Sequence, residues 1–237
     1  MSRKDDSIGA LFQAGTKYRR GQLPSRTGKL APSLKVYANP LEVATLPVPD
    51  LKGGKGIWHT LSQAREQIAE GGRISLLELG QILWATAGFT YGKQRTHIAA
   101  GPISSLEVYL IVRQVQDMFS GVYHYSPRDH SLEYLLRDDM SNDLEAILLG
   151  DSTNIDACAA ILAFTGLPAR HEDGAKSRAY RYLYLEAGAA AQCAVSSAVA
   201  MDLVASFKAE FYDDELARLL SLDVNNEFPL CVVTLGT

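Results

Sequence analysis

The sequence predicts an α+β protein in which helices cover a mostly antiparallel or mixed sheet. Two observations lead to this class. Three short runs rich in β-branched and aromatic residues follow one another with short polar connections, and segments with helical periodicity lie on either side of them. Strands joined by such short turns pair antiparallel, so residues 106–113, 121–125 and 132–136 are predicted to form a meander.

Two helices are predicted before the meander. Residues 57–69 show helical periodicity. Ser75 and Glu78 then have the spacing of a capping box, in which each side chain satisfies a backbone N–H group at the start of a helix, and an apolar run follows. This pattern predicts a helix over 75–86 that ends at Gly88.

Five elements are predicted after the meander. They are a short helix at 141–149, a strand or buried segment at 157–164, a long helix from about 177 to 207, an amphipathic helix at 213–220 and a final strand at 228–235. The long helix carries little side-chain volume, because small residues recur along it: Gly188, Ala189, Ala190, Ala191, Ala194 and Ala198. Such a helix admits either a flat ligand or another subunit, and both interpretations stay open.

The composition excludes several classes of protein. With 237 residues, 47% of them hydrophobic, the chain can bury a substantial core. A formal net charge of −4 gives no broad basic surface, so a nucleic acid is not an expected partner. The start has no apolar run of signal-peptide length, and the longest uncharged stretch, 187–201, is too short to span a bilayer. We therefore expect a cytoplasmic protein with no membrane partner.

The common catalytic and metal-binding motifs are absent. The sequence has no Walker or dinucleotide glycine loop, no HExxH, no GxSxG and no paired CxxC. Cys158, Cys193 and Cys231 lie in apolar surroundings, which predicts buried thiols. His124 and His130 lie six residues apart in a hairpin, a poor arrangement for a metal, and are predicted to be exposed. No metal site is expected.

Residues 1–56 are predicted to form an irregular extension that wraps around a core domain of residues 57–237. The extension holds more than half of the nine prolines, which interrupt regular structure. Its basic clusters, at 17–20 and 26–29, fit either a solvated surface or a contact with a phosphate or a peptide leader.

Several stretches, in this order, resemble the nitroreductase superfamily and in particular its SagB-type branch: ISLLELGQILWATAGFT, RTHIAAGPISSLEVYLIV, GVYHYSPRDHSLEYL, RAYRYLYLEAGAAAQCAV and FYDDELARLLSLDVNNEFPLCVVTLG. They cover most of the chain. The resemblance implies a dimer with FMN at the subunit interface and the long helix at that interface. It also implies oxidoreductase chemistry, since the branch includes dehydrogenases that convert azolines to azoles in ribosomal peptides.

The resemblance also assigns residues. Arg65 and Arg95 are expected to bind the FMN phosphate or the flavin edge, and Gln192 to contact the ring. The backbone of Ala99, Ala100 and Gly101 corresponds to a loop that lies against the flavin in the family. Lys176 and Tyr180 are candidate groups for proton transfer. Two residues have a plain alternative: Arg95 as the partner of an acidic residue, and Tyr180 as a core or interface aromatic.

Several family signatures are altered in this chain. Only Arg65 is basic where a phosphate clamp of several residues is usual, and alanine replaces serine at Ala99. Gly174 and Ala175 stand where azoline dehydrogenases have lysine and tyrosine.

Two functions are therefore predicted. The first is an FMN-dependent dehydrogenase or oxidase that tailors a ribosomal peptide or a related natural product, with a peptide or small molecule as substrate. The alternative is a flavin-poor subunit that serves as a structural or substrate-binding partner in a biosynthetic complex. The resemblance implies a homodimer, or a heterodimer with a paralogue.

Overall fold

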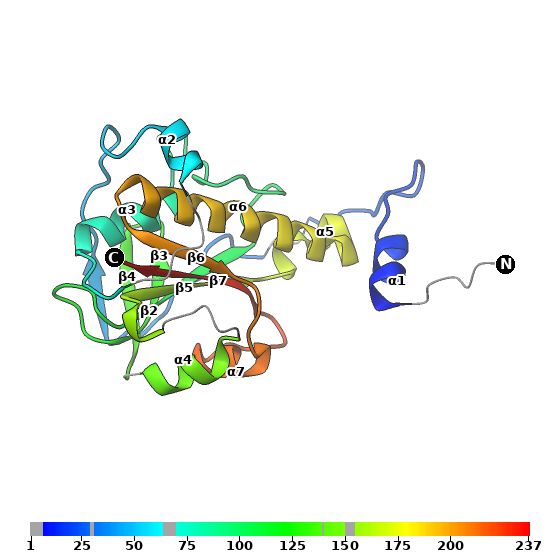
Figure 1. Ribbon diagram of the computed structural model, residues 1–237. Helices are drawn as coiled ribbons and strands as arrows, with labels where there is room; N and C mark the ends of the chain where they lie inside the picture. Colours follow the sequence, from blue (N-terminus) through cyan, green and yellow to red (C-terminus); the bar gives the residue numbers. More distant parts are fainter. Residues whose placement is uncertain (1–6, 29–30, 64–69, 139, 150–154) are drawn as a thin grey trace.

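A computed structural model describes residues 7–28, 31–63, 70–138, 140–149 and 155–237 of the chain. These residues form one seven-stranded sheet in the order β1-β4-β3-β2-β5-β7-β6, and every neighbouring pair is antiparallel. The predicted α+β class is confirmed, with an antiparallel sheet (Figure 1). The strands are β1 Glu42–Thr45, β2 Leu106–Val112, β3 Gly121–Ser126, β4 Ser131–Arg137, β5 Ala160–Gly166, β6 Val204–Lys208 and β7 Phe228–Gly236.

The described α-helices are α1 Ile8–Gly15, α2 Ile57–Ser62, α3 Leu76–Ala87, α4 Ser141–Ile147, α5 Ala169–Ala175, α6 Ala179–Ala200 and α7 Asp213–Leu219. Helix α1 stands apart from the sheet, and other helices cover both of its faces (Figure 1). Helices α3 and α6 pack on one face, and α4 and α7 lie on the other (Figure 1). The sheet is therefore the middle layer, with an apolar core on each side.

The local patterns that predicted the meander and α3 are confirmed. Strands β2, β3 and β4 pair consecutively, through connections at residues 113–120 and 127–130. At the start of α3, the Glu78 N–H donates to Ser75 Oγ at 3.2 Å and the Ser75 N–H donates to Glu78 Oε2 at 2.8 Å, which completes the capping box. The helix ends at Gly88. In the preceding predicted helix, Ile57–Ser62 is helical and residues 64–69 lie outside the described part.

The predicted long helix ends earlier than the sequence suggests, and its extension to residue 207 is wrong. The Leu203 N–H donates to the Ala198 carbonyl and the Asp202 N–H to the Val199 carbonyl, while Asp202 has φ of 64°. These bonds form a Schellman motif, which usually has glycine at the position with positive φ. Asp202 concealed this stop, and the residues beyond it form β6.

The small residues of α6 pack mainly within the chain. A row of alanines faces the sheet and α3 and is buried: Ala187, Ala190, Ala191, Ala194 and Ala198. Their small side chains let the helix lie close to the sheet. The opposite face is exposed and partly apolar, because the side chains of Tyr184 and Leu185 are open to solvent.

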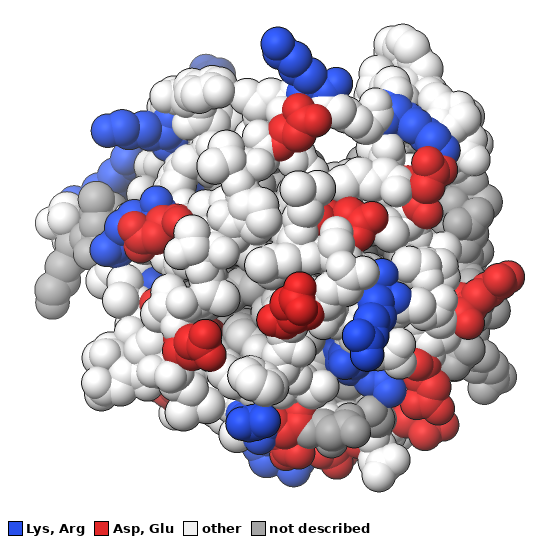
Figure 2. Space-filling view, turned by 90° about the vertical axis from the view of Figure 1, so that its left-hand side faces the viewer, with Lys and Arg blue, Asp and Glu red and all other residues white. Residues whose placement is uncertain are grey.

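The surface has no field of a single charge sign on the face shown in Figure 2, where acidic and basic side chains are interspersed. This distribution agrees with the small net charge.

In the segment before α2, β1 pairs with β4 at the edge of the sheet.

A buried ionic network crosses the sheet, and it contradicts the prediction that His124 is exposed. His124 is fully buried, with Nε2 3.0 Å from Glu107 Oε2 and Nδ1 2.7 Å from Glu133 Oε2. Glu107 also accepts hydrogen bonds from the Arg170 guanidinium and, at 3.0 Å, from the Lys35 N–H. Both carboxylates satisfy the imidazole, so burial is compatible with its polarity. His130 is half-buried and bonds to Tyr125.

The same network shifts the pKa values of its members. Burial alone would raise the pKa of Glu107, but the hydrogen bond from His124 and the charge of Arg170 lower it to about 2. Burial would lower the pKa of His124, but hydrogen bonds to Glu107 and Glu133 raise it. The network therefore favours the charged forms.

Glu107→Gln should destabilise the protein by about 3–5 kcal/mol, because it leaves the charge of Arg170 buried without its partner. Urea unfolding at neutral pH measures this change. Glu145→Gln, at an exposed position of α4, is the control and should change stability little. Equal stabilities of the two variants would contradict the assigned role of Glu107.

The network also predicts how stability depends on pH. Glu107 has its ordinary pKa of 4.5 lowered to about 2, so its contribution is complete above pH 4.5 and is lost as pH falls toward 2. The pKa of His124 is raised above 6.5, so its contribution is complete below pH 6.5 and is lost as pH rises through the folded-state value. Urea unfolding at a series of pH values measures both effects. In His124→Gln, the loss of stability with rising pH above 6.5 should be absent. If the variant lost stability over the same pH interval as the unaltered protein, another titrating group would be the cause.

Candidate functional site

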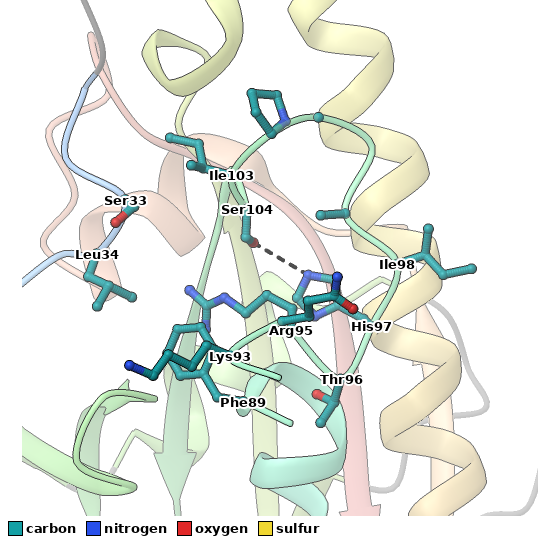
Figure 3. Close-up of a pocket in the computed structure, with 14 residues that line it drawn as sticks. Ser33, Leu34, Phe89, Lys93, Arg95, Thr96, His97, Ile98, Ile103 and Ser104 are labelled. Carbon is teal, nitrogen blue, oxygen red and sulfur yellow. Dashed lines mark hydrogen bonds between the residues drawn. The ribbon is translucent and has the colours of Figure 1, made fainter. Parts of the chain in front are cut away.

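The segment 95–105, between α3 and β2, forms one wall of a pocket of about 630 Å³, called here the loop pocket. Arg95, Phe89 and Lys93 lie together on one side of the segment, and Ile98 lies on the other (Figure 3). The remaining lining residues come from the same segment and from an N-terminal stretch: Ser33, Leu34, Gln94, Thr96, His97, Ala99, Gly101, Pro102, Ile103 and Ser104.

The start of the segment is fixed by the carboxyl end of α3. Arg95 Nη1 donates to the Ala87 carbonyl at 2.5 Å, and the Thr96 hydroxyl donates to the Trp84 carbonyl at 2.9 Å. The His97 ring bonds to the Thr86 carbonyl through Nδ1 at 2.8 Å. The last carbonyls of a helix have no partner inside it. The segment supplies these partners and is thereby held against α3.

The end of the segment is fixed by a buried carboxylate of α6. Glu186 is fully buried, and its Oε2 accepts hydrogen bonds from the Ser105 N–H, at 3.0 Å, and from the Ser105 hydroxyl. Two imidazoles flank it: His97 Nε2 lies 3.4 Å from Oε1 and His171 Nε2 lies 3.7 Å from Oε2. Burial would raise the pKa of Glu186, but His171, His97 and Ser105 together lower it far below its usual value. An ionised carboxylate therefore lies directly behind the segment.

Gly101 is required by the packing of His171. A Cβ atom at Gly101 would lie 2.3 Å from Cε1 and 2.5 Å from Nδ1 of that ring. The absence of a side chain lets the imidazole lie against the backbone of the segment. The segment is thus thin at Ala99, Ala100 and Gly101, and a ligand on its other side could approach the backbone closely.

Arg95 lines the loop pocket, but its guanidinium is already engaged. It bonds to Ala87, and its Cζ lies 4.8 Å from the centroid of the Phe89 ring. Burial lowers the pKa of Arg95. The alternative predicted for Arg95 was a salt bridge with an acidic residue. Among the described residues Arg95 forms no salt bridge. Lys93, exposed at the same pocket, is a second cation that the sequence did not single out.

The other predicted residues lie elsewhere. Ala99 and Gly101 line the loop pocket, whereas Ala100 lines a neighbouring cavity. Gln192 lies on the exposed face of α6, where its amide donates to Ser196 Oγ at 2.8 Å. Arg65 falls outside the described residues.

Lys176 and Tyr180 share a separate, open pocket of about 500 Å³ at the start of α6. The Tyr180 ring stacks on Phe228, with centroids 5.9 Å apart, as its aromatic-packing alternative predicts. The loop pocket is not lined by Lys176, Tyr180 or Gln192 of the same chain.

Sequence reasoning missed Glu186, His97 and His171 as parts of the site. The contact between Glu186 and Ser105 joins residues 81 positions apart, so no local spacing could indicate it. The available signal was the single glutamate of α6, which directly precedes the run of small residues 187–191, because buried charges have partners.

The match to known proteins identifies the family. The model of the nitroreductase family matches residues 72–237. The chain belongs to the nitroreductase family. A protein named as a nitroreductase, MJ1384 of Methanocaldococcus jannaschii, is 30% identical over 167 residues, which cover 69% of this chain and 81% of that protein.

Solved structures share the fold. A protein named as a nitroreductase from Ralstonia eutropha JMP134 has a TM-score of 0.70 and 23% identity, over 91% of this chain and 94% of that one. A chain of the E. coli microcin synthetase McbBCD complex, with truncated pro-MccB17 bound, has a TM-score of 0.65 and 18% identity, over 100% of this chain and 84% of that one. Family membership makes the chain a nitroreductase-family oxidoreductase.

Three further observations concern metal binding, membrane spans and the cysteines. Within the described ranges, no group of three or more histidine, cysteine, aspartate or glutamate side chains is arranged to hold a metal ion. No helix in these ranges is long and apolar enough to cross a membrane. Cys158 and Cys231 are buried, as predicted, and Cys193 is partly exposed.

Gly101→Ala should displace the segment from His171 and cost about 1–3 kcal/mol of stability, as overpacking does in protein interiors. Thermal unfolding of the variant measures the change. Gly92→Ala, where an added Cβ would meet one atom at 3.8 Å, is the matched control and should be nearly neutral. Equal unfolding temperatures of Gly101→Ala and the control would contradict the close contact between Gly101 and the His171 ring.

Proposed function

We propose that the protein is an FMN-dependent oxidoreductase whose flavin binds in the loop pocket. The observation that carries this proposal is the thin, rigidly anchored segment 95–105, which borders a pocket that also contains two cationic side chains, Lys93 and Arg95. A flat ring system can lie against backbone where the side chains are small. A phosphate group is bound by backbone N–H groups and by cationic side chains. The loop pocket offers both within one volume.

The pocket fits FMN in size and in the chemistry of its lining. Its volume of about 630 Å³ lies within the range of roughly 300–1,000 Å³ for small-molecule sites. The backbone at Ala99 and Gly101 would contact the ring, and Lys93 with Arg95 would face the phosphate or the flavin edge. FMN, when bound, supplies the hydride chemistry. The chain orients it, and the ionised Glu186 holds the supporting segment in place.

A second subunit would complete the site. The exposed face of α6 includes Tyr184, Leu185 and Gln192, and α2 beside it exposes Trp58. Exposed apolar surface of this kind is typical of subunit interfaces. In a homodimer, or in a heterodimer with a paralogue, Gln192 of this face would contact a flavin held by the other subunit.

A ribosomal peptide or a related natural product is the proposed substrate. The support is the microcin synthetase chain, whose fold extends over the whole of this chain and whose complex holds truncated pro-MccB17. The reaction would be a dehydrogenation, such as azoline to azole. Lys176 and Tyr180, beside the start of α6, are the proposed groups for proton transfer. Because they do not line the loop pocket of their own chain, they would act at a flavin held by the other subunit.

One observation favours the alternative of a flavin-poor subunit. The Arg95 guanidinium is committed to the Ala87 carbonyl and the Phe89 ring, so it would have to move to bind a phosphate. A chain that keeps the fold and the subunit surface but lacks flavin would then bind a substrate peptide or a partner protein.

The purified protein should carry stoichiometric FMN, seen in its visible absorption spectrum and identified by chromatography after denaturation. Lys93→Gln should weaken FMN binding about tenfold or more, because a hydrogen bond to a charged group contributes about 1.5–3 kcal/mol. Lys52→Gln, exposed and away from the loop pocket, should leave binding unchanged. A protein that neither retains nor takes up FMN would support the flavin-poor alternative.

A further inference from the structure

A second, smaller cavity of about 170 Å³ lies on the other side of the segment 100–102. We call it the N-terminal cavity, because Tyr18 and Arg26 of the N-terminal stretch form part of its wall. Gly101 and Pro102 line both this cavity and the loop pocket. The other walls come from α5 and α6: Arg170, His171, Asp173, Gly174, Ala175 and Tyr182.

Hydrogen-bond donors gather at this cavity. The hydroxyls of Tyr18 and Tyr182 lie 3.1 Å apart, and Tyr18 also bonds weakly to the Gly174 carbonyl at 3.5 Å. Arg26 lies against Gly174, since a Cβ atom there would be 2.9 Å from Arg26 Nε. The missing side chain of Gly174 thus leaves space for the guanidinium.

Two charged groups on the wall, Asp173 and Arg170, are engaged in other contacts. Asp173 accepts hydrogen bonds from the Thr27 N–H at 2.7 Å, from the Thr27 hydroxyl and from the Gly28 N–H at 3.1 Å. These bonds fix the backbone beside Arg26. Arg170 bonds to Glu107 and to backbone carbonyls. Asp173 therefore anchors the stretch, and its oxygens are occupied.

His171 faces Glu186 through Nε2, but its Nδ1 is buried without a hydrogen-bond partner among the described residues. Its side chain is 1% exposed. Nε2 faces Glu186 at 3.7 Å, while the Nδ1 edge lies beside Gly101 at the cavity wall. Buried polar groups are nearly always paired, so the unpaired Nδ1 at a cavity indicates a missing partner.

We propose that the N-terminal cavity binds a carboxylate group, held by Arg26 and the Tyr18 hydroxyl and in contact with His171. The wall presents a guanidinium and hydroxyl donors, and a carboxylate accepts from both. The cavity of about 170 Å³ corresponds to about six water molecules at ~30 Å³ each, enough for a small acid or for the terminus of a chain. This proposal does not depend on flavin binding in the loop pocket.

Acetate binding to the full-length protein tests the proposal. With ¹⁵N-labelled histidine, the ring nitrogens of the five histidines are followed by NMR during titration at constant ionic strength, with chloride as the balancing anion. Acetate should shift the His171 signals in a saturable manner, and His171→Gln identifies those signals. Arg26→Gln should weaken binding at least tenfold. Arg19→Gln, an exposed arginine of the same stretch that does not line the cavity, should leave it unchanged.

Other ligands define the source of the carboxylate. Acetamide, which is uncharged, should not bind. N-acetylglycine binding more tightly than acetate would identify a peptide terminus, and exclusion of N-acetylglycine would identify a small free acid. The proposal is overturned if the His171 signals do not saturate, if Arg19→Gln weakens binding as much as Arg26→Gln, or if only Lys93→Gln weakens it. The last result would place acetate in the loop pocket.

Discussion

The hydrogen bonds between the Glu186 carboxylate and Ser105 are the interaction on which the site depends. They join the middle of α6 to the residue that precedes β2, deep inside the protein. A buried carboxylate is stable only when its charge is compensated. Ser105, His97 and His171 surround this one, and the same three residues define where the segment 95–105 runs. Sheet, helix and pocket wall are thus fixed by a single charged group.

The end of the segment is also held by a buried ion pair. Arg170 of α5 donates to the carbonyls of Ser104 and Leu106 and pairs with Glu107. Glu107 in turn contacts His124 on β3, which continues the network across the sheet. The junction before β2 is therefore held by side chains of both α6 and α5. Such preorganisation suits a wall that must stay in place while a ligand binds against it.

Local patterns predicted much of the fold and little of the site. The capping box at Ser75 and the alternation in β2 to β4 are set by neighbouring residues, so the sequence showed them directly. The end of α6 was missed because Asp202 takes a backbone conformation usually given to glycine. Glu186 contacts Ser105 only through the tertiary fold, and Gln192 faces outward from α6. These long-range placements leave no periodic signal.

The most direct test of this account is amide hydrogen exchange at Ser105 and the segment before it, in Glu186→Gln compared with Glu172→Gln, an exposed position of α5. A neutral amide is a weaker acceptor than a carboxylate, so the account predicts faster exchange at Ser105 and along 97–104 in Glu186→Gln alone. Strands β3 and β4 should exchange as before. Unchanged protection at Ser105 would show that the segment is held by something other than Glu186, and would contradict the account.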